Sequence, residues 1–282
     1  MRRRRALYLA LCGVASIAAC SGYSSSNGGG DTPDGGGPLD GASPESATPP
    51  PPGPSGDAGP DGPWCMLNAP NASVCDDFDE PGTFSGKWMK TDAYHATEDT
   101  VDDPNALSAP RVLLTTTDGA GSDVSTATLG WHVDAATTIS YGYALRVDHA
   151  AVPTDGGNNS IAFFQLSVTS PSGTGFITLY PQAGGSGLNH FANAPDGGTI
   201  YGRTIGPLPA IDDGKWHVVV VKASLTPPRA ITVGIDGMIP KDDELDTGFD
   251  PGSVNLAGCV TYALQGNDGW KIAFDNVWFE SH

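Results

Sequence analysis

The feature that most constrains the fold of this chain is the regular spacing of its turn residues after position 63. Short runs rich in Val, Ile, Thr and aromatic residues are separated by Gly, Pro, Asp and Asn about every ten residues. No segment keeps the 3.6-residue period of an amphipathic helix. The pattern predicts an all-β sandwich or jelly roll, with strands near 74–78, 87–91, 111–116, 125–133, 139–148, 160–168, 176–180, 199–203, 215–223, 231–236, 260–264 and 271–280.

The preceding segment, residues 21–63, has a different composition. It is rich in Gly, Ser, Pro and Asp, and it contains no Lys or Arg and no aromatic residue after Tyr23. Such a segment buries too little apolar surface to offset the entropy lost on ordering. We therefore predict a disordered linker, with its Pro-rich half acting as an extended spacer.

The first twenty residues have the organisation of an export signal. Four consecutive arginines precede a short apolar stretch, which small residues connect to Cys20. The segment Ile17-Ala18-Ala19-Cys20 resembles the bacterial lipobox, in which the cysteine becomes the lipidated first residue. The alternative is an ordinary secretory signal cut near Ala19. The predicted organisation is a signal peptide (1–19), a lipidated tether (20–63) and one β-sandwich domain (64–282). This places the protein outside the cytoplasm at the bacterial cell envelope, attached to the membrane through its lipid alone.

Three cysteines remain in the predicted domain. Cys65 and Cys75 flank a turn-rich segment, and Cys259 lies near the C-terminus. In an oxidising compartment an odd number leaves one thiol unpaired. A Cys65–Cys75 disulfide is the favoured pairing and Cys75–Cys259 is the alternative. No cysteine or histidine spacing indicates zinc.

The charge of the chain restricts its partners. Fourteen Lys and Arg oppose 32 Asp and Glu, so the formal net charge is −18. Such a field repels nucleic acid and other polyanions. We therefore expect no nucleic-acid partner, and an anionic substrate would need a local basic pocket.

Four segments together resemble the laminin-G-like, concanavalin A-like jelly rolls. They are Asp-Gly-Lys-Trp-His at 213–217 before a valine run, the strand and turn at 231–237, Val-Cys-Asp-Asp-Phe-Asp at 74–79, and Phe-Asp-Asn-Val at 274–277. The resemblance covers roughly residues 74–280. It implies two packed antiparallel sheets, one of them concave, and pairing of the first strand with the last. It also implies carbohydrate recognition as the commonest role, although this fold hosts several functions.

The leading hypothesis is a non-catalytic domain that binds a polysaccharide or a cell-surface glycan. Aromatic rings stack on sugars, and amide, hydroxyl and imidazole groups bind sugar hydroxyls. An envelope protein-interaction domain without a sugar ligand is an alternative. Trp131 and Trp270 would be stacking platforms unless they pack in the core, where Trp216 and Trp278 are expected. The candidate ligand-binding residues are Gln165, Tyr180, Tyr201, His217, Trp131 and Trp270.

A polysaccharide lyase is the catalytic alternative. The segment Phe163-Phe164-Gln165-Leu166-Ser167 resembles the Gln strand of alginate and glucuronan lyases. By that resemblance Gln165 would neutralise a uronate carboxylate with help from Arg146, and Tyr180 or His217 would transfer the proton. Ser167 stands where alginate lyases place a His, and their Tyr-x-Lys-x-Gly-x-Tyr strand is absent. The Glu-x-Asp-x-x-Glu strand of glucanases is also absent, and the acidic segment 241–246 is expected to be a solvated loop.

No organic cofactor is expected, but a structural calcium ion is a further hypothesis. Asp76, Asp77 and Asp79 lie near the first strand, and Asp275 and Asn276 lie on its expected neighbour. Calcium prefers such hard oxygen ligands. We assign Asp76, Asp77 and Asp275 as the candidate ligands. The alternative is that these carboxylates cap turns at the strand ends.

Overall fold

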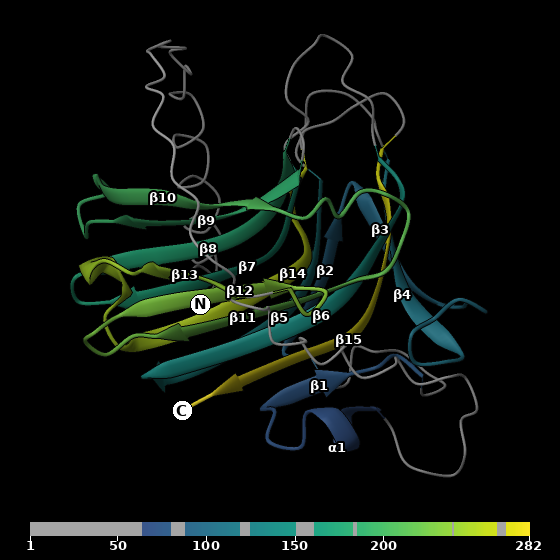
Figure 1. Ribbon diagram of the computed structural model, residues 1–282, viewed down its shortest axis with the longest axis horizontal. Helices are drawn as coiled ribbons and strands as arrows, with labels where there is room; N and C mark the ends of the chain where they lie inside the picture. The colour runs from purple at the N-terminus through teal and green to yellow at the C-terminus, as the bar shows by residue number, and fades with distance from the viewer. Residues whose placement is uncertain are drawn as a thin grey trace, which may run out of the picture. The chain divides into compact units, whose positions relative to one another are not determined.

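The computed structural model describes residues 64–79, 88–118, 125–150, 161–182, 185–238, 240–263 and 269–282. These residues form two antiparallel β-sheets packed face to face, with one short helix, α1 (Trp64–Asn68), before the first strand (Figure 1). The expected all-β sandwich is confirmed. Among the described residues, no helix has the length and apolar character that crossing a membrane requires.

Sheet A has eight strands in the order β13-β12-β11-β6-β15-β4-β3, and β1 also pairs with β15. Their bounds are β1 Val74–Asp76, β3 Ala96–Asp102, β4 Arg111–Thr117, β6 Thr138–His149, β11 His217–Ser224, β12 Ala230–Ile235, β13 Lys241–Glu244 and β15 Lys271–Ser281. The predicted pairing of the first and last strands is confirmed, with Cys75 opposite Trp278. The predicted hairpin is also present, because Val221 of β11 pairs with Val233 of β12.

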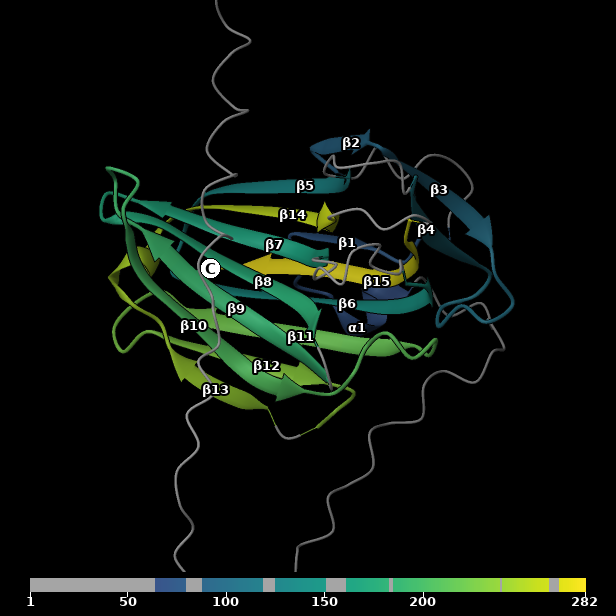
Figure 2. The same ribbon diagram turned by 90° about the horizontal axis from the view of Figure 1, so that it is seen from above.

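Sheet B has seven strands in the order β10-β9-β8-β7-β14-β5-β2, and Figure 2 shows most of them side by side. Their bounds are β2 Lys90–Tyr94, β5 Ser125–Ala136, β7 Ile161–Ser170, β8 Gly173–Gln182, β9 Gly185–Asn193, β10 Thr199–Leu208 and β14 Gly252–Ala263. Between β13 and β14, Thr247–Phe249 form one 3-10 turn.

The core lies between the two sheets and follows from strand alternation. In β6, Tyr141, Tyr143, Leu145 and Val147 are buried in it, as the two-residue period predicts. The ring of Tyr143 stacks on Phe164 from sheet B at 4.3 Å between centroids. This contact joins the sheets at their centre, so the alternate residues of β6 and β7 face outward.

Several segments differ from the sequence prediction. No strand was expected at 96–102 or 185–193, yet these residues form β3 at the edge of sheet A and β9 between β8 and β10. The acidic segment at 241–246 was expected to be a solvated loop, but Lys241–Glu244 form the edge strand β13. There Asp243 accepts hydrogen bonds from Arg203, at 3.0 Å, and from the buried His190, at 2.9 Å. These partners on sheet B stabilise the acidic strand.

The cysteines are arranged as the first of the two predicted pairings. Cys65 and Cys75 form a disulfide with their Cα atoms 5.7 Å apart, which ties α1 to β1. Cys259 lies in β14 as a buried free thiol. Burial raises the pKa of this thiol well above its usual value, so it is held protonated and unreactive.

Candidate functional site

The outer face of sheet B carries polar side chains that cross four neighbouring strands. The register pairs Thr178 of β8 with Asn189 of β9, and Asn189 with Thr204 of β10. Gln165 of β7 lies beside Thr178, because a β-bulge sets two residues of β7 opposite this one residue. Thr204 Oγ1 donates a hydrogen bond to Asn189 Oδ1 at 2.6 Å. We call Gln165, Thr178, Asn189 and Thr204 the polar row.

The bulge explains why Gln165 faces outward. Phe163 and Phe164 are consecutive yet both fully buried, and Phe164 adopts a positive φ of 41°. The ring of Phe164 occupies the space beside Gly258 of β14, where an added Cβ would lie 2.1 Å from the ring. Gln165 is thereby turned to the outer face, where it is half-buried. Within the described residues its amide makes no hydrogen bond, so it is available to a ligand.

Aromatic side chains flank the polar row on both sides. Tyr180 lies two residues along β8 and covers Gly187 of β9, where an added Cβ would lie 3.0 Å from the tyrosine Oη. On the other side, Phe176 and Phe191 face each other across β8 and β9, with ring centroids 4.9 Å apart and an interplanar angle of 22°. All three side chains are half-buried. The face therefore alternates aromatic, polar and aromatic surfaces.

A histidine lies further along the same face. His132 of β5 is exposed and sits opposite Asn255 of β14, which in turn pairs with Ser167 of β7. His132 Nδ1 is 2.8 Å from Asn255 Oδ1, and Nε2 is 3.1 Å from Asp134 Oδ1. The hydrogen bond to Asn255, followed by that to Asp134, raises the pKa of His132 above its usual value. His132 is therefore a proton-exchanging group on the face that carries Gln165.

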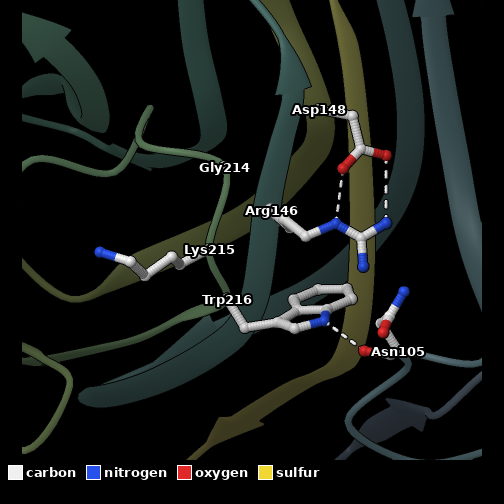
Figure 3. A pocket seen from close by; sticks show the side chains of 6 residues that line it. All are labelled: Asn105, Arg146, Asp148, Gly214, Lys215 and Trp216. Carbon is white, nitrogen blue, oxygen red and sulfur yellow. Dashed lines mark hydrogen bonds and ion pairs between the residues drawn. The ribbon is translucent and has the colours of Figure 1, made fainter.

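The outer face of sheet A carries a pocket of about 480 Å³ lined by Asn105, Arg146, Asp148, Gly214, Lys215 and Trp216 (Figure 3). Arg146 of β6 donates to both oxygens of Asp148, at 2.5 and 3.1 Å, and to Asp103 at 2.7 Å. Its guanidinium lies 4.9 Å from the centroid of the Trp216 ring.

The polar groups of this pocket already bind one another. Trp216 Nε1 donates to the backbone oxygen of Asn105 at 2.5 Å, which joins the loop before β11 to the loop after β3. The remaining nitrogen of Arg146, Nη1, is buried without a hydrogen-bond acceptor among the described residues. Figure 3 shows the Lys215 side chain directed away from the guanidinium. We therefore describe Arg146, Asp103, Asp148 and Trp216 as a clasp that holds two loops on β6.

His217 is also fully engaged. Its Nδ1 is 2.6 Å from Asp236 Oδ2 and its Nε2 is 2.8 Å from Asp213 Oδ1, and the side chain is 8% exposed. Burial alone would lower the pKa of His217, but the hydrogen bonds to Asp236 and Asp213 outweigh it and raise the pKa. The ring is therefore favoured in its charged form, held between two carboxylates.

Comparison with solved structures finds relatives of the same architecture at low sequence identity. An endo-β-1,4-glucuronan lyase from the fungus Trichoderma reesei aligns with a TM-score of 0.51 and 16% identity, over 75% of this chain and 96% of that chain. The domain has the concanavalin A-like jelly-roll fold. An alginate lyase bound to an alginate trisaccharide aligns at a TM-score of 0.48 and 14% identity, over 75% and 98%. The carbohydrate recognition domain of Emp47p aligns at 0.46 and 13%, over 76% and 98%. No family model and no curated protein matches the sequence.

This concanavalin A-like domain separates the four residues expected to act together in a lyase. Gln165 and Tyr180 share the outer face of sheet B, whereas Arg146 and His217 belong to sheet A. Arg146 alternates with the buried residues of β6 and faces outward from the other side of the core. The expected convergence of the four is therefore wrong. Both nitrogens of His217 already bind carboxylates, so a sugar or a proton acceptor would have to displace Asp236 or Asp213.

The tryptophans also occupy other places than expected. Trp270 is 4% exposed and lies in the core, whereas Trp131 is partly buried against the core. Trp216 was expected in the core, but it lies half-buried in the clasp. Trp278 is half-buried as well, and its indole occupies the space beside Gly142, where an added Cβ would lie 2.6 Å from Nε1. The face of the sheet on which each side chain lies decides whether a tryptophan is buried. Alternation in the sequence did not show which of the two faces is the inner one.

The remaining predicted site residues are the lipidated cysteine, one tyrosine and three aspartates. Cys20 lies outside the described residues, and so does the side chain of Tyr201, although its backbone belongs to β10. Asp76, Asp77 and Asp275 are all buried beside the β1–β15 pairing. The residue types alone did not indicate six further residues of the candidate site, which are Phe176, Thr178, Asn189, Phe191, Thr204 and His132. Alternation along 176–180 groups Phe176, Thr178 and Tyr180, but only the register to the unexpected strand β9 adds those of β9 and β10.

Proposed function

We propose that the protein is a lipid-anchored envelope protein whose domain binds a neutral glycan, without catalysis, on the outer face of sheet B. The observation that supports this most directly is the polar row with aromatic side chains on both sides. Tyr180 covers one side of the row, and the Phe176–Phe191 pair covers the other. A sugar presents hydroxyl groups at its rim and C–H groups on its ring faces. Uncharged hydrogen-bonding groups between aromatic rings match that surface.

The charge of the protein favours a neutral ligand. The four residues of the polar row carry no charge, and the chain as a whole carries −18. A polyuronate would be repelled by this field unless arginine or lysine side chains approached it locally. Arg146 does not supply that charge, because it faces outward from sheet A and is neutralised by Asp103 and Asp148.

A glycan array of the purified protein is the first test. We expect binding to one class of neutral glycan. Tyr180→Ala and Gln165→Ala should each weaken that binding roughly tenfold, which corresponds to the loss of one stacking contact or one to two hydrogen bonds. Lys222→Ala is the matched control, because Lys222 is exposed on β11 of sheet A.

Two results would contradict the proposal. An array without any neutral hit would leave the envelope interaction domain as the better reading. Full affinity in both sheet B variants, with loss in the Lys222 control, would move the ligand to the other sheet. Circular dichroism of each variant must match the parent protein, because a folding defect would imitate a binding defect.

Polysaccharide lyase activity is the second candidate, because Gln165 and His132 lie on one face of a fold shared with a glucuronan lyase. Lyase products absorb near 232 nm by the family resemblance. Absorbance growth on polyuronates that disappears in Gln165→Ala would replace the binding proposal by this one. Growth that persists in Gln165→Ala would show a contaminating activity.

The anchor is tested separately from the glycan. We expect radiolabelled palmitate to label the protein and the protein to sediment with membranes. Cys20→Ala should abolish both. No labelling of the parent protein would show that the signal is cut as an ordinary secretory peptide instead, and unchanged labelling in Cys20→Ala would place the lipid on another residue.

A further inference from the structure

A buried carboxylate without a partner lies immediately after the first strand. Asp77 is fully buried, and neither of its side-chain oxygens has a hydrogen-bond partner among the described residues. It forms no ion pair there either. Taking an ionised carboxylate out of water costs several kcal/mol when nothing compensates for it. In its ionised form, a buried group of this kind is stabilised by a partner that supplies positive charge.

A second unsatisfied oxygen lies on the neighbouring strand. Asn276 of β15 is 7% exposed, and its Oδ1 has no hydrogen-bond donor among the described residues. The register pairs Asp76 with Val277, so Asp77 and Asn276 are the next residues along this antiparallel pair. Asn276 has a positive φ of 52°, a conformation that Asn and Asp adopt more readily than most residues. Two buried residues with unsatisfied oxygens therefore lie at the same end of the β1–β15 pairing.

The neighbouring carboxylates of Asp275 and Asp76 do not compensate for the buried charge of Asp77, because their oxygens already accept hydrogen bonds from other groups. Asp275 accepts hydrogen bonds from the amides of Leu107 and Ser108, from Ser108 Oγ at 2.6 Å and from the amide of Asn276. Asp76 accepts from Trp88 Nε1 and from the amide of Phe78, both at 3.0 Å. These groups are acceptors only and add negative charge. The excess of buried oxygen over donors is therefore local to Asp77 and Asn276.

We propose that this junction binds a calcium ion, with the Asp77 carboxylate and Asn276 Oδ1 as side-chain ligands. Calcium accepts carboxylate, amide and backbone oxygens together with water in flexible geometry, whereas magnesium demands near-ideal octahedral geometry. No group of three or more His, Cys, Asp or Glu side chains in the described residues is arranged to hold a metal. A site with one carboxylate and one amide is therefore completed by backbone oxygens and water. Its dissociation constant is expected to be about 10⁻⁴–10⁻³ M, as in extracellular modules.

The proposed ligands differ from those expected from the sequence, because only Asp77 is common to both sets. Asp76 and Asp275 organise the junction through hydrogen bonds to Trp88 and to the loop at Ser108. Ser108 Oγ also lies 3.4 Å from the backbone oxygen of Asp77, so this loop closes over the junction. The bound ion would join the first and last strands, and it lies on sheet A rather than at the polar row.

The test uses the full-length protein, stripped with EDTA and kept in 0.15 M NaCl to screen its net charge. Terbium replaces calcium at oxygen sites, and Trp88 bonds the residue next to Asp77. We expect terbium emission on tryptophan excitation, displacement of terbium by calcium, and a melting temperature that rises with calcium. Asp77→Asn should weaken calcium binding at least tenfold, and Asp212→Asn, an exposed acid, should not change it.

Asn276→Asp is the second variant, because it keeps the oxygen position and adds a charge. We expect it to melt lower than the parent protein in EDTA and to bind calcium more tightly. Absence of terbium emission and of any calcium shift up to 10 mM in the parent protein would overturn the proposal. Equal responses in the parent protein and Asp77→Asn would also overturn it, because they indicate diffuse attraction to an acidic surface. These results are independent of the glycan array, since the two sites lie on different sheets.

Discussion

Replacing Arg146 by Met distinguishes a structural clasp from a ligand pocket. The change keeps an apolar stem of similar length and removes only the guanidinium. Three contacts are lost: the two-point contact with Asp148, the bond to Asp103 at 2.7 Å and the packing on Trp216. Asp148 on β6 and Asp103 in the loop after β3 would then lack their shared cation.

The size of the effect follows from burial. The side chains of Arg146, Asp103 and Asp148 are 13%, 12% and 26% exposed, so the network is largely shielded from water. Breaking a buried ion pair by removing one partner costs about 3–5 kcal/mol. The partial exposure of Asp148 favours the lower end, and loss of the cation–π contact adds about 0.5–1 kcal/mol. We expect the free energy of unfolding to fall by about 3–4 kcal/mol in Arg146→Met. For a domain of this size, the melting temperature should fall by roughly 10 °C.

Urea unfolding followed by tryptophan fluorescence measures this change through the midpoint at constant slope. Asp148→Asn and the double variant complete a mutant cycle, and strong coupling between the two is expected. Lys215→Met is the matched control from the same pocket, because Lys215 is 78% exposed and its ammonium group bonds only Asp213 among the described residues. Its unfolding midpoint should be unchanged.

Two outcomes would refute the clasp. A loss of less than about 1 kcal/mol in Arg146→Met would show that the guanidinium contributes little to holding the loops. Abolished glycan binding at unchanged stability would show that the pocket of Figure 3 is the ligand site.

Three further predictions concern the core, the disulfide and His217. Gly258→Ala places a methyl group 2.1 Å from the buried ring of Phe164. We expect the free energy of unfolding, measured in urea, to fall by about 2–3 kcal/mol. Adding Phe164→Leu should recover part of this loss, because it removes the ring that the methyl group meets. Cys65→Ser with Cys75→Ser opens a loop of ten residues and should cost about 3 kcal/mol by the chain-entropy model, measured in the same way. The pKa of His217 is raised in the folded state, so its contribution is complete below the unfolded pKa of about 6.5 and is lost as pH rises through the folded pKa. The stability difference between the parent protein and His217→Gln should therefore shrink from pH 6 to pH 9, and a difference that grows would contradict the assignment.

The architecture was predictable because it depends on short-range patterns. Alternation in β6 placed Tyr141 and Tyr143 on one face, and both are buried there. The segment 74–79 and the segment 274–277 resembled paired first and last strands, and Val74 pairs with Phe279. These features require only the local period and the order of segments. They do not require the register between strands that are far apart in sequence.

The candidate site was predictable only in part, because it depends on that register. Gln165 and Tyr180 were chosen from their residue types, and the structure places both on sheet B. Arg146 was grouped with them although β6 belongs to the other sheet, and no local pattern distinguishes the two sheets. The bulge at Phe164 turns Gln165 outward, and Asn189 joins it from a segment where no strand was expected. The local pattern does not determine the register between strands that are distant in sequence, so it could not predict which side chains lie next to one another.

The two outer faces of the sandwich differ in how much hydrogen-bonding capacity remains for a ligand. On sheet A, the clasp uses Arg146 and Trp216 to fix two loops. On sheet B, by contrast, the Gln165 amide makes no hydrogen bond within the described residues. A ligand on sheet A would have to displace charged partners from one another, at a cost of several kcal/mol. On sheet B it could bind the Gln165 amide without displacing a protein partner from that group. The balance of engaged and unengaged groups, more than the resemblance to any one relative, is the reason to look for the glycan across β7, β8 and β9.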